Sequence, residues 1–292
     1  MFKSVLLAIR PKTLTAAIVP IMVAASLVQM QEQKLQLWIV ACALLSAIFI
    51  QIATNFFNDA IDFKKGADTD QRIGPQRVTQ SGLMSSQSVF WWAIGFCVLA
   101  LFFGVPLVYK GGWVIVGIGL LSLFLAYGYT GGPFPLAYKG LGDFFVILFF
   151  GLIAVGGVYY LLVESWSVDA LVAGLQCGFL ATVLIAINNL RDVEQDKLVH
   201  KKTLPVRFGV SFAKLEIILL ISLSYLLNLY WWFTYKLIWV SLLPLLTLPL
   251  AVVLIYKLLM TKPSKIYNQF LALSALLQII FCGLLSIGFL LQ

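Results

Sequence analysis

The chain has 292 residues, of which 61% are hydrophobic and only 11% are charged. Soluble domains carry about 25% charged residues, so this composition excludes an ordinary soluble protein and indicates an integral membrane protein. The net charge of +8 does not point to nucleic acid in so apolar a chain, because basic residues gather in the cytoplasmic loops of membrane proteins. We therefore expect the lipid bilayer, and no nucleic acid, as a partner.

Apolar segments follow one another along the whole chain. A membrane-spanning helix needs about 20 predominantly apolar residues. On this measure the sequence predicts an all-α, polytopic membrane protein, with nine transmembrane helices in a single domain over residues 1–292. The spans are expected at about 13–30, 35–57, 88–109, 112–129, 143–163, 168–190, 213–234, 237–256 and 268–290.

The distribution of basic residues predicts the orientation of these spans. Nine spans place the two termini on opposite sides of the membrane. With a cytoplasmic N-terminus, 17 of the 20 Lys and Arg residues lie on the cytoplasmic side, and only Lys34, Lys110 and Lys236 lie outside. Because basic loops favour the cytoplasm, we expect the N-terminus inside, the C-terminus outside, and the two long charged loops on the cytoplasmic side.

The first charged loop begins at the end of the second span. Asn55, Asp59 and Asp62 are spaced i, i+4 and i+7, so they share one face of a helix. Carboxylates at a membrane boundary are costly unless a cation, a partner charge or a water-filled cavity compensates them. The basic residues that follow are Lys64, Lys65, Arg72 and Arg77.

A second stretch repeats this arrangement at the end of the sixth span. Asn188, Asp192 and Asp196 are spaced i, i+4 and i+8. Oxygen ligands without His or Cys nearby favour a hard cation such as Mg²⁺, which binds through one or two carboxylates plus phosphate oxygens. One such stretch alone could be a solvated helix end, whereas two on the same side predict a shared site for Mg²⁺ and a lipid diphosphate. The basic residues here are Arg191, Lys197, Lys201, Lys202 and Arg207.

Both stretches resemble the aspartate-rich motifs of the UbiA superfamily of intramembrane prenyltransferases. The first motif is carried by residues 55–62 with Lys64, Lys65, Gly66, Asp68 and residues 72–75, and the second by residues 188–196 and 202–209. Residues 10–13, 131–136 and 138–142 are most similar to the branch of the superfamily that prenylates 1,4-dihydroxy-2-naphthoate in menaquinone synthesis. The resemblance covers nearly the whole chain.

This resemblance implies nine helices around a central cavity in a bacterial cytoplasmic membrane, with the active site on the cytoplasmic side. It also implies the reaction. Mg²⁺ and basic side chains draw diphosphate from a polyprenyl diphosphate, and the ring of the aromatic acceptor attacks the resulting cation. With a naphthoate acceptor the carboxylate leaves as CO₂, and the product is demethylmenaquinol.

The resemblance and the spacing together assign roles to named residues. Two Mg²⁺ ions bridging the diphosphate would be held by Asn55, Asp59, Asn188, Asp192 and Asp196. Asp59, Asp62 and Asp192 are the catalytic candidates, with Asp62 either a further ligand or the base for the acceptor hydroxyl. Tyr138 is a weaker candidate for contact with the cation or the acceptor. The residues expected to bind substrate are Arg10, Lys64, Arg72, Arg77, Tyr127, Lys139, Arg191, Lys197, Lys201, Lys202 and Arg207.

Two alternatives stay open from the sequence. The acceptor could be 4-hydroxybenzoate, homogentisate, a porphyrin or a chlorophyllide. The chain could also be a cation-coupled secondary transporter, although transporter acids lie near the membrane midplane and these acids cluster at one face. Prenyl chain length and oligomeric state do not follow from the sequence.

Overall fold

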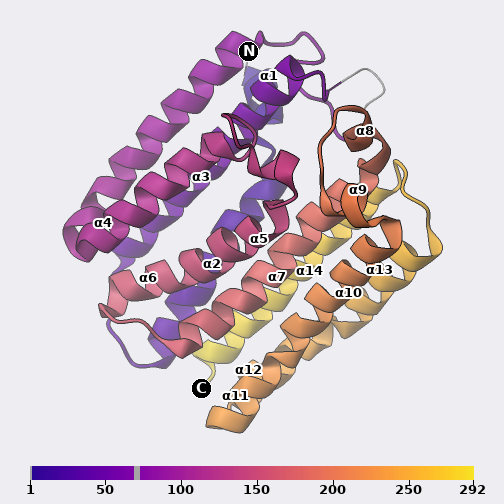
Figure 1. Cartoon of the computed structure of the whole chain (residues 1–292). Coiled ribbons are helices and arrows are strands. Elements are labelled where there is room, and N and C mark those ends of the chain that lie inside the picture. Colours follow the sequence, from indigo (N-terminus) through magenta and orange to yellow (C-terminus); the bar gives the residue numbers. More distant parts are fainter. Residues whose placement is uncertain (1, 69–72) are drawn as a thin grey trace.

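The computed structural model describes residues 2–68 and 73–292. The helices form one bundle, in which the two termini lie at opposite ends (Figure 1). No strand occurs among the described residues. The helical elements are α1 (Phe2–Ile9), α2 (Pro11–Met30), α3 (Leu37–Lys64), α4 (Ser86–Gly128), η1 (Leu136–Lys139), α5 (Gly142–Ile147), η2 (Leu148–Ile153), α6 (Ala154–Val163), α7 (Val168–Arg191), α8 (Val193–Leu198), α9 (Leu204–Phe208), α10 (Val210–Leu226), α11 (Asn228–Tyr235), α12 (Ile238–Leu242), η3 (Leu243–Thr247), α13 (Leu248–Met260) and α14 (Tyr267–Leu290).

The predicted number of membrane crossings is consistent with the structure. In the described part of the chain, eight helical stretches are long and apolar enough to span a bilayer. One of them, α4, runs for 43 residues, which is about 64 Å at 1.5 Å per residue and about twice the thickness of a bilayer core. It therefore crosses twice, as the separate spans predicted at 88–109 and 112–129 require, and the described residues cross nine times.

A glycine makes the turn inside α4 possible. Gly112 has φ of +60° and ψ of −148°, a conformation that residues with a Cβ rarely adopt. The chain doubles back at this point (Figure 1). We call residues 86–111 the first arm of α4 and residues 113–128 its return arm.

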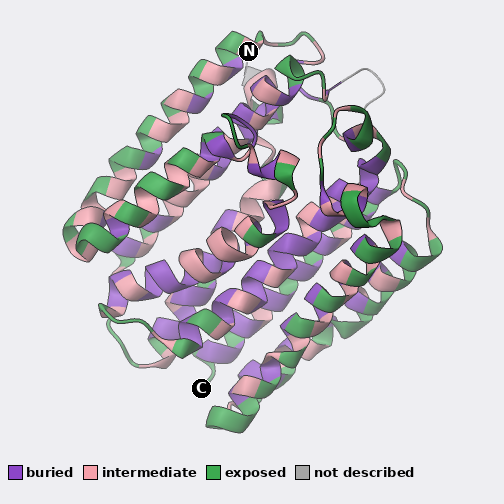
Figure 2. Cartoon of the chain, in the orientation of Figure 1, coloured by how far each residue is buried: buried purple, intermediate pink, exposed green. Residues whose placement is uncertain are grey.

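Two apolar clusters hold the bundle together. One joins buried side chains of α2, α6, α7, α10, α13 and α14, together with residues from the N-terminal part of α3 and from α4 near Gly112, such as Ile39 and Leu107. The other joins α1, α4 and the C-terminal half of α3 around Phe56 and Phe57. Buried residues line the inward faces of the helices, whereas the periphery is exposed (Figure 2). The smaller cluster therefore lies near the end of α3 that carries the first acidic stretch.

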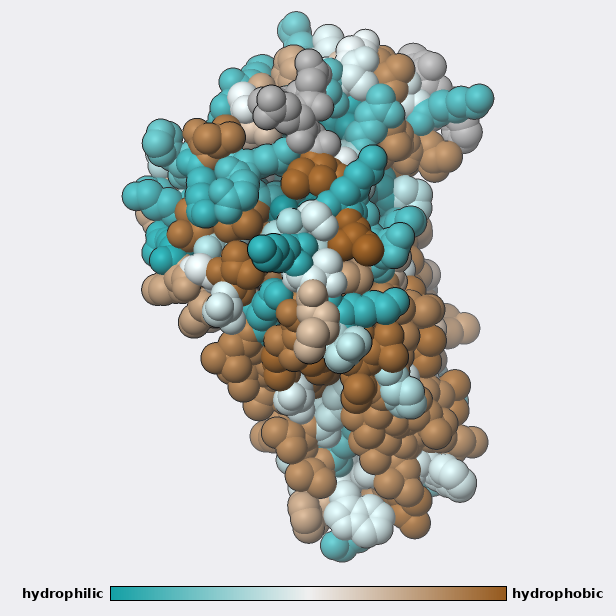
Figure 3. All heavy atoms as spheres, turned by 90° about the vertical axis from the view of Figure 1, so that its right-hand side faces the viewer, coloured by the Kyte–Doolittle hydropathy of each residue, from teal (hydrophilic) through white to brown (hydrophobic). Residues whose placement is uncertain are grey.

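Polar and apolar surface is divided along the long axis of the molecule. Hydrophilic residues gather at the end that carries α8 and α9, and a broad hydrophobic zone covers the surface below it (Figure 3). That polar end is also the end of the bundle where α1 lies (Figure 1). Exposed apolar side chains such as Phe102, Phe124 and Val252 are the expected contacts of lipid tails.

Candidate active site

The two acidic stretches meet in one small polar cavity of about 30 Å³. The first stretch reaches it from the end of α3, because α3 continues to Lys64, well beyond the predicted span. The second reaches it from the end of α7 and from α8. The cavity is lined by Asp62, Ala67, Asp68, Arg77, Asn188, Asp192, Gln195, Asp196 and Lys201.

Arg77 connects the carboxylates of the first stretch. Its guanidinium lies 3.6 Å from Asp62 Oδ2 and 3.4 Å from Asp68 Oδ2, and all three side chains are buried. Arg77 Nη1 is buried and has no hydrogen-bond partner among the described residues. Because a buried unpaired guanidinium donor is costly, this atom is suited to an anionic oxygen entering the cavity.

Arg191 organises the second stretch. It is 1% exposed, and its Nε and Nη2 donate to the two carboxylate oxygens of Asp192 at 2.7 and 2.6 Å. The same guanidinium donates to Asn188 at 2.8 Å and to Asn268 of α14 at 2.7 Å. Asn268 in turn donates to the carbonyl of Ile73 in the loop after the first stretch. Arg191 therefore holds Asp192 in place and, through Asn268, ties the two stretches together.

The cavity concentrates negative charge. Thr203 donates to Asp196 at 3.3 Å and Lys201 Nζ lies 3.5 Å from it. Burial raises the pKa of Asp196 to about 6; Lys201 opposes this shift, and the charges of Asp192 and Asp62 add to it. A cation entering between these carboxylates would relieve their repulsion.

Tyr138 links this cavity to two lysines. Its hydroxyl donates to Asp62 at 2.9 Å. Lys65 Nζ lies 4.1 Å and Lys201 Nζ 5.7 Å from the centre of its ring, within the range of cation–π attraction. Burial, followed by the charge of Asp62, raises the pKa of Tyr138 well above its usual value. The phenol therefore stays protonated and keeps Asp62 oriented.

Asn55 and Asp59 lie outside this cavity, although both were predicted to bind metal. Asp59 is fully buried and accepts hydrogen bonds from Val78 N, Thr79 N and the Thr79 hydroxyl. Asn55 donates to the carbonyl of Ile9 at 2.9 Å. The shared helix face is as predicted, but the loop after α3 covers it at Asp59 and the N-terminal helices cover it at Asn55. Only Asp62, at the C-terminal end of this face, reaches the cavity.

The structure places the predicted substrate-binding residues in several different surroundings. Arg77 and Lys201 line the cavity, and Arg191 lies behind it. Two other side chains are bound to protein groups away from the cavity. Lys197 pairs with Glu194 at the surface, and Arg207 donates to the carbonyls of Lys202 and Lys139.

The remaining predicted residues are not part of the cavity lining that the structure describes, and Arg72 lies outside the described residues. Lys64, Lys139 and Lys202 are exposed, Arg10 lies at the junction of α1 and α2, and Tyr127 packs on the rings of Phe57 and Phe90.

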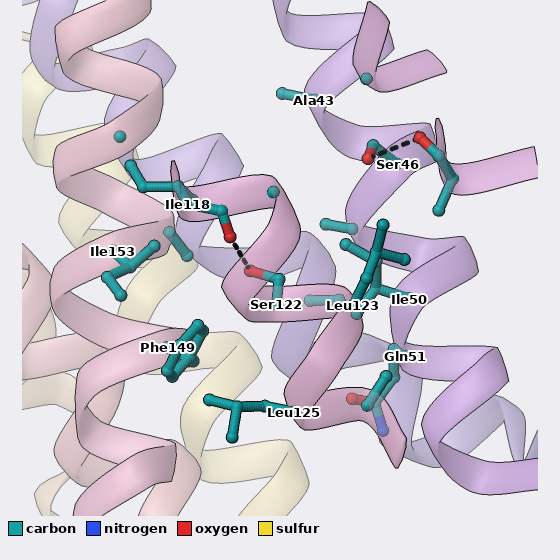
Figure 4. A pocket seen from close by; sticks show the side chains of 18 of the residues that line it. Ala43, Ser46, Ile50, Gln51, Ile118, Ser122, Leu123, Leu125, Phe149 and Ile153 are labelled. Carbon is teal, nitrogen blue, oxygen red and sulfur yellow. Dashed lines mark hydrogen bonds between the residues drawn. The ribbon is translucent and has the colours of Figure 1, made fainter. Parts of the chain in front are cut away.

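A large apolar cavity of about 350 Å³ lies beside the polar one. It is bounded by α2, α3, both arms of α4 and the helix formed by α5, η2 and α6, and Figure 4 shows its wall of Ile, Leu and Phe side chains. Its polar groups include Gln51, Thr54 and Tyr129. Tyr129 lines this cavity, and its carbonyl accepts a hydrogen bond from Ala137 N, next to Tyr138, whose hydroxyl donates to Asp62. The apolar cavity therefore comes close to the carboxylates of the polar one at Tyr129.

Sequence reasoning missed the roles of Tyr129 and Lys65. Tyr129 is two residues beyond the predicted Tyr127, which turns its ring to the other side of the helix. A signal was present, since Tyr129 directly precedes the Gly- and Pro-rich segment 130–142. Lys65 directly follows Lys64, and the sequence alone does not show which of the two lysines lies beside Tyr138.

The oxygen atoms that line the polar cavity are suitable ligands for Mg²⁺. They are oxygens of Asp62, Asp68, Asn188, Asp192, Gln195 and Asp196. Mg²⁺ usually binds through one or two carboxylates and completes its octahedron with water and substrate phosphates. Among the described residues, no three acidic, His or Cys side chains lie close enough together to hold a metal ion by themselves.

Comparison with known proteins gives consistent matches. Residues 17–289 match the UbiA prenyltransferase family. The chain is 35% identical to the 1,4-dihydroxy-2-naphthoate octaprenyltransferase of Haemophilus influenzae, over 96% of this chain and 94% of the relative. It is 37% identical to the Escherichia coli protein of the same name over 69% of this chain and 67% of that one. The structure of a UbiA homolog from Archaeoglobus fulgidus bound to DMAPP and Mg²⁺ matches with a TM-score of 0.64 at 19% identity, covering 97% of this chain and 99% of that one.

Proposed function

Because the chain belongs to the UbiA prenyltransferase family, we propose that it transfers a polyprenyl group from polyprenyl diphosphate to 1,4-dihydroxy-2-naphthoate, as its relatives' names indicate. The observation that carries this proposal is the adjacency of the two cavities at Tyr129. The charges that line the polar cavity complement a diphosphate, and the apolar walls of the neighbouring cavity suit a prenyl chain. The product would be demethylmenaquinol, released with diphosphate and CO₂.

The polar cavity would promote departure of the diphosphate. Asp62, Asp68, Asn188, Asp192 and Asp196 would hold Mg²⁺, with two ions sharing one diphosphate. Bound Mg²⁺ would supply positive charge to the diphosphate oxygens. Arg77 Nη1, the free buried donor, would bind a further oxygen, because charge-assisted hydrogen bonds from arginine are strong.

The chemistry at the prenyl carbon follows from this arrangement. The bond between C1 and the diphosphate oxygen breaks, and its electrons leave with diphosphate. An electron-rich carbon of the acceptor ring then bonds to C1. Loss of the carboxylate as CO₂ returns its bonding electrons to the ring. The apolar walls exclude the water that would otherwise capture the allylic cation.

The direct test is to incubate membranes with Mg²⁺, a polyprenyl diphosphate and a panel of aromatic acceptors, and to identify the products by mass. We expect a prenylated, decarboxylated naphthalenediol that is absent when EDTA is added. A product formed only with 4-hydroxybenzoate, homogentisate, a porphyrin or a chlorophyllide would transfer the proposal to that acceptor. No Mg²⁺-dependent product with any acceptor would favour a transporter.

We also propose that the polar end of the bundle faces the cytoplasm, because 17 of the 20 basic residues belong to that side. In a variant without native cysteines, a cysteine replacing exposed Lys197 should react with an impermeant thiol reagent only after the cytoplasmic face is opened. A cysteine replacing Lys34 should react in intact cells. The reverse pattern would contradict this orientation.

A further inference from the structure

Three basic side chains at the polar end of the bundle have no acidic partner among the described residues. They are Lys139 at the end of η1, Lys202 just before α9, and Arg207 within α9, and all three are exposed. None of them belongs to an ion pair that the described residues form, and none lines the polar cavity. We call these three residues the basic junction. The mechanism proposed above leaves their charges unused.

The two segments that carry the basic junction contain no acid. Residues 130–142 and 197–215 include neither Asp nor Glu. The other basic side chains of residues 197–215 have protein partners, which are Glu194 for Lys197, Asp196 for Lys201, and the carbonyls of Leu259 and Thr261 for Lys214. The charge of the basic junction is therefore available to an anion from outside the protein.

Arg207 holds the two segments together. Its Nε donates to the carbonyl of Lys202 at 3.1 Å, and its Nη2 donates to the carbonyl of Lys139 at 2.9 Å. The segments approach closely, since a Cβ atom on Gly140 would lie 2.6 Å from the Lys202 carbonyl oxygen and 3.2 Å from Arg207 Nε. These contacts bring three positively charged residues next to one another. Because like charges repel at short range, a bound anion would stabilise this arrangement.

Exposed aromatic rings flank the basic junction. Lys139 Nζ lies 5.2 Å from the centre of the Phe134 ring, and the rings of Phe208 and Phe212 lie 4.9 Å apart. These three rings are 57%, 59% and 42% exposed, and apolar surface is interleaved with hydrophilic surface at the end that carries α8 and α9 (Figure 3). Phe208 and Phe212 flank the start of a candidate membrane span, Val210–Tyr235. Aromatic side chains at span ends lie at the interface between lipid and water, so the basic junction lies at the depth of the lipid headgroups.

We propose that Lys139, Lys202 and Arg207 form a binding site for the phosphate of an anionic phospholipid in the cytoplasmic leaflet. Anionic headgroups attract basic residues beside a membrane span, and hydrogen bonds from Lys and Arg to phosphate are strong. The long lysine side chains can reach the phosphate while their methylene groups stay on apolar surface. Phe208 and Phe212 would contact the acyl chains of the same lipid.

A lipid at this site would support the wall of the polar cavity from outside. The backbone N–H of Lys202 donates to the carbonyl of Tyr138 at 3.1 Å, and the Tyr138 hydroxyl donates to Asp62 at 2.9 Å. The residue before Lys202 is Lys201, which lines the cavity. By holding α9 against the 130–142 segment, the bound phosphate would keep these groups in position. The site differs from the donor site, because its side chains lie outside the polar cavity.

The test measures binding of phosphatidylglycerol to the purified protein in a neutral detergent by native mass spectrometry. The variant combines Lys139→Gln and Lys202→Gln and keeps Arg207, so the hydrogen bonds that join the segments remain. Each lysine beside an anionic lipid contributes about fivefold to affinity, so this variant should bind about 25-fold more weakly. Phosphatidylcholine, which has no net charge, should bind weakly to the wild-type protein and to the variant alike.

The matched control combines Lys257→Gln and Lys265→Gln. Both lysines are exposed, one in the last turn of α13 and one between α13 and α14, so the change in charge is the same. This control should bind phosphatidylglycerol like wild type. Both double variants should unfold at the wild-type temperature in neutral detergent, because they change exposed side chains.

Three results would overturn the inference: an equal loss in both double variants, no loss in either, or displacement of phosphatidylglycerol by inorganic diphosphate. The last result would mean that the site takes soluble phosphates instead of a lipid. The measurement uses no prenyl donor and no acceptor, so its outcome does not depend on the proposed reaction. A wild-type protein that binds phosphatidylglycerol at this site but prenylates no acceptor would reject the proposed function and leave the lipid site in place.

Discussion

Replacing Asp62 or Asp192 by Asn is expected to lower turnover by a factor on the order of a hundred or more, because each change removes charge that holds the cation against the leaving diphosphate. Since the two carboxylates would act on one diphosphate, the double variant should lose much less than the product of the single losses. Initial rates over a range of Mg²⁺ concentrations test this. Extra Mg²⁺ should restore part of the activity of each single variant.

Two controls separate this effect from general damage. Glu194→Gln removes an exposed acid on α8 whose partner is Lys197, and its activity should remain close to wild type. Asp59→Asn should lower thermal stability, because the amide cannot accept all three hydrogen bonds of the Val78–Thr79 segment, while the Mg²⁺ dependence stays unchanged. Near-normal activity of Asp192→Asn beside an inactive Asp62→Asn would reject the joint site.

Replacing Arg191 by Met is expected to destabilise the protein by about 3–5 kcal/mol, because it leaves the buried carboxylate of Asp192 without its guanidinium. Thermal unfolding in detergent measures this loss. Replacing both Arg191 and Asp192 by Met should recover much of the stability, since no buried charge is then left unpaired, but it should not recover activity.

The matched control is Lys197→Met, which breaks a surface ion pair and should change the unfolding free energy by about 1 kcal/mol or less. If Arg191→Met unfolds like wild type but binds the prenyl donor poorly, Arg191 is a substrate ligand. That result would restore the role that its position in the sequence predicted.

Much of the fold follows from the sequence because hydrophobic segment length is set by the bilayer. Even the division of α4 was predictable, since Lys110, Gly111 and Gly112 interrupt the apolar run. The backbone conformation of η2 was not. Its π-helical turn lies where Gly151 approaches Gly174 and Gly178 of the next span, a contact that the sequence does not reveal.

The candidate site was predictable as a pair of motifs, but not residue by residue. Helical spacing placed Asn55, Asp59 and Asp62 on one face correctly. It could not show that the loop carrying Val78 and Thr79 folds back over Asp59. The surroundings of Arg191 also depend on a long-range contact, because its hydrogen-bond partner Asn268 lies 77 residues away in the sequence. The charge pattern indicated a site for diphosphate, whereas tertiary packing determines which charges face it.

Both acidic stretches are expected to bind one diphosphate together with Mg²⁺. The most direct measurement is calorimetric binding of a non-hydrolysable prenyl diphosphate analogue to the purified protein, with Mg²⁺ and with EDTA. We predict binding that requires Mg²⁺ and that weakens on the order of tenfold or more in both Asp62→Asn and Asp192→Asn. Binding that persists in EDTA, or that is unchanged in either variant, would contradict the account.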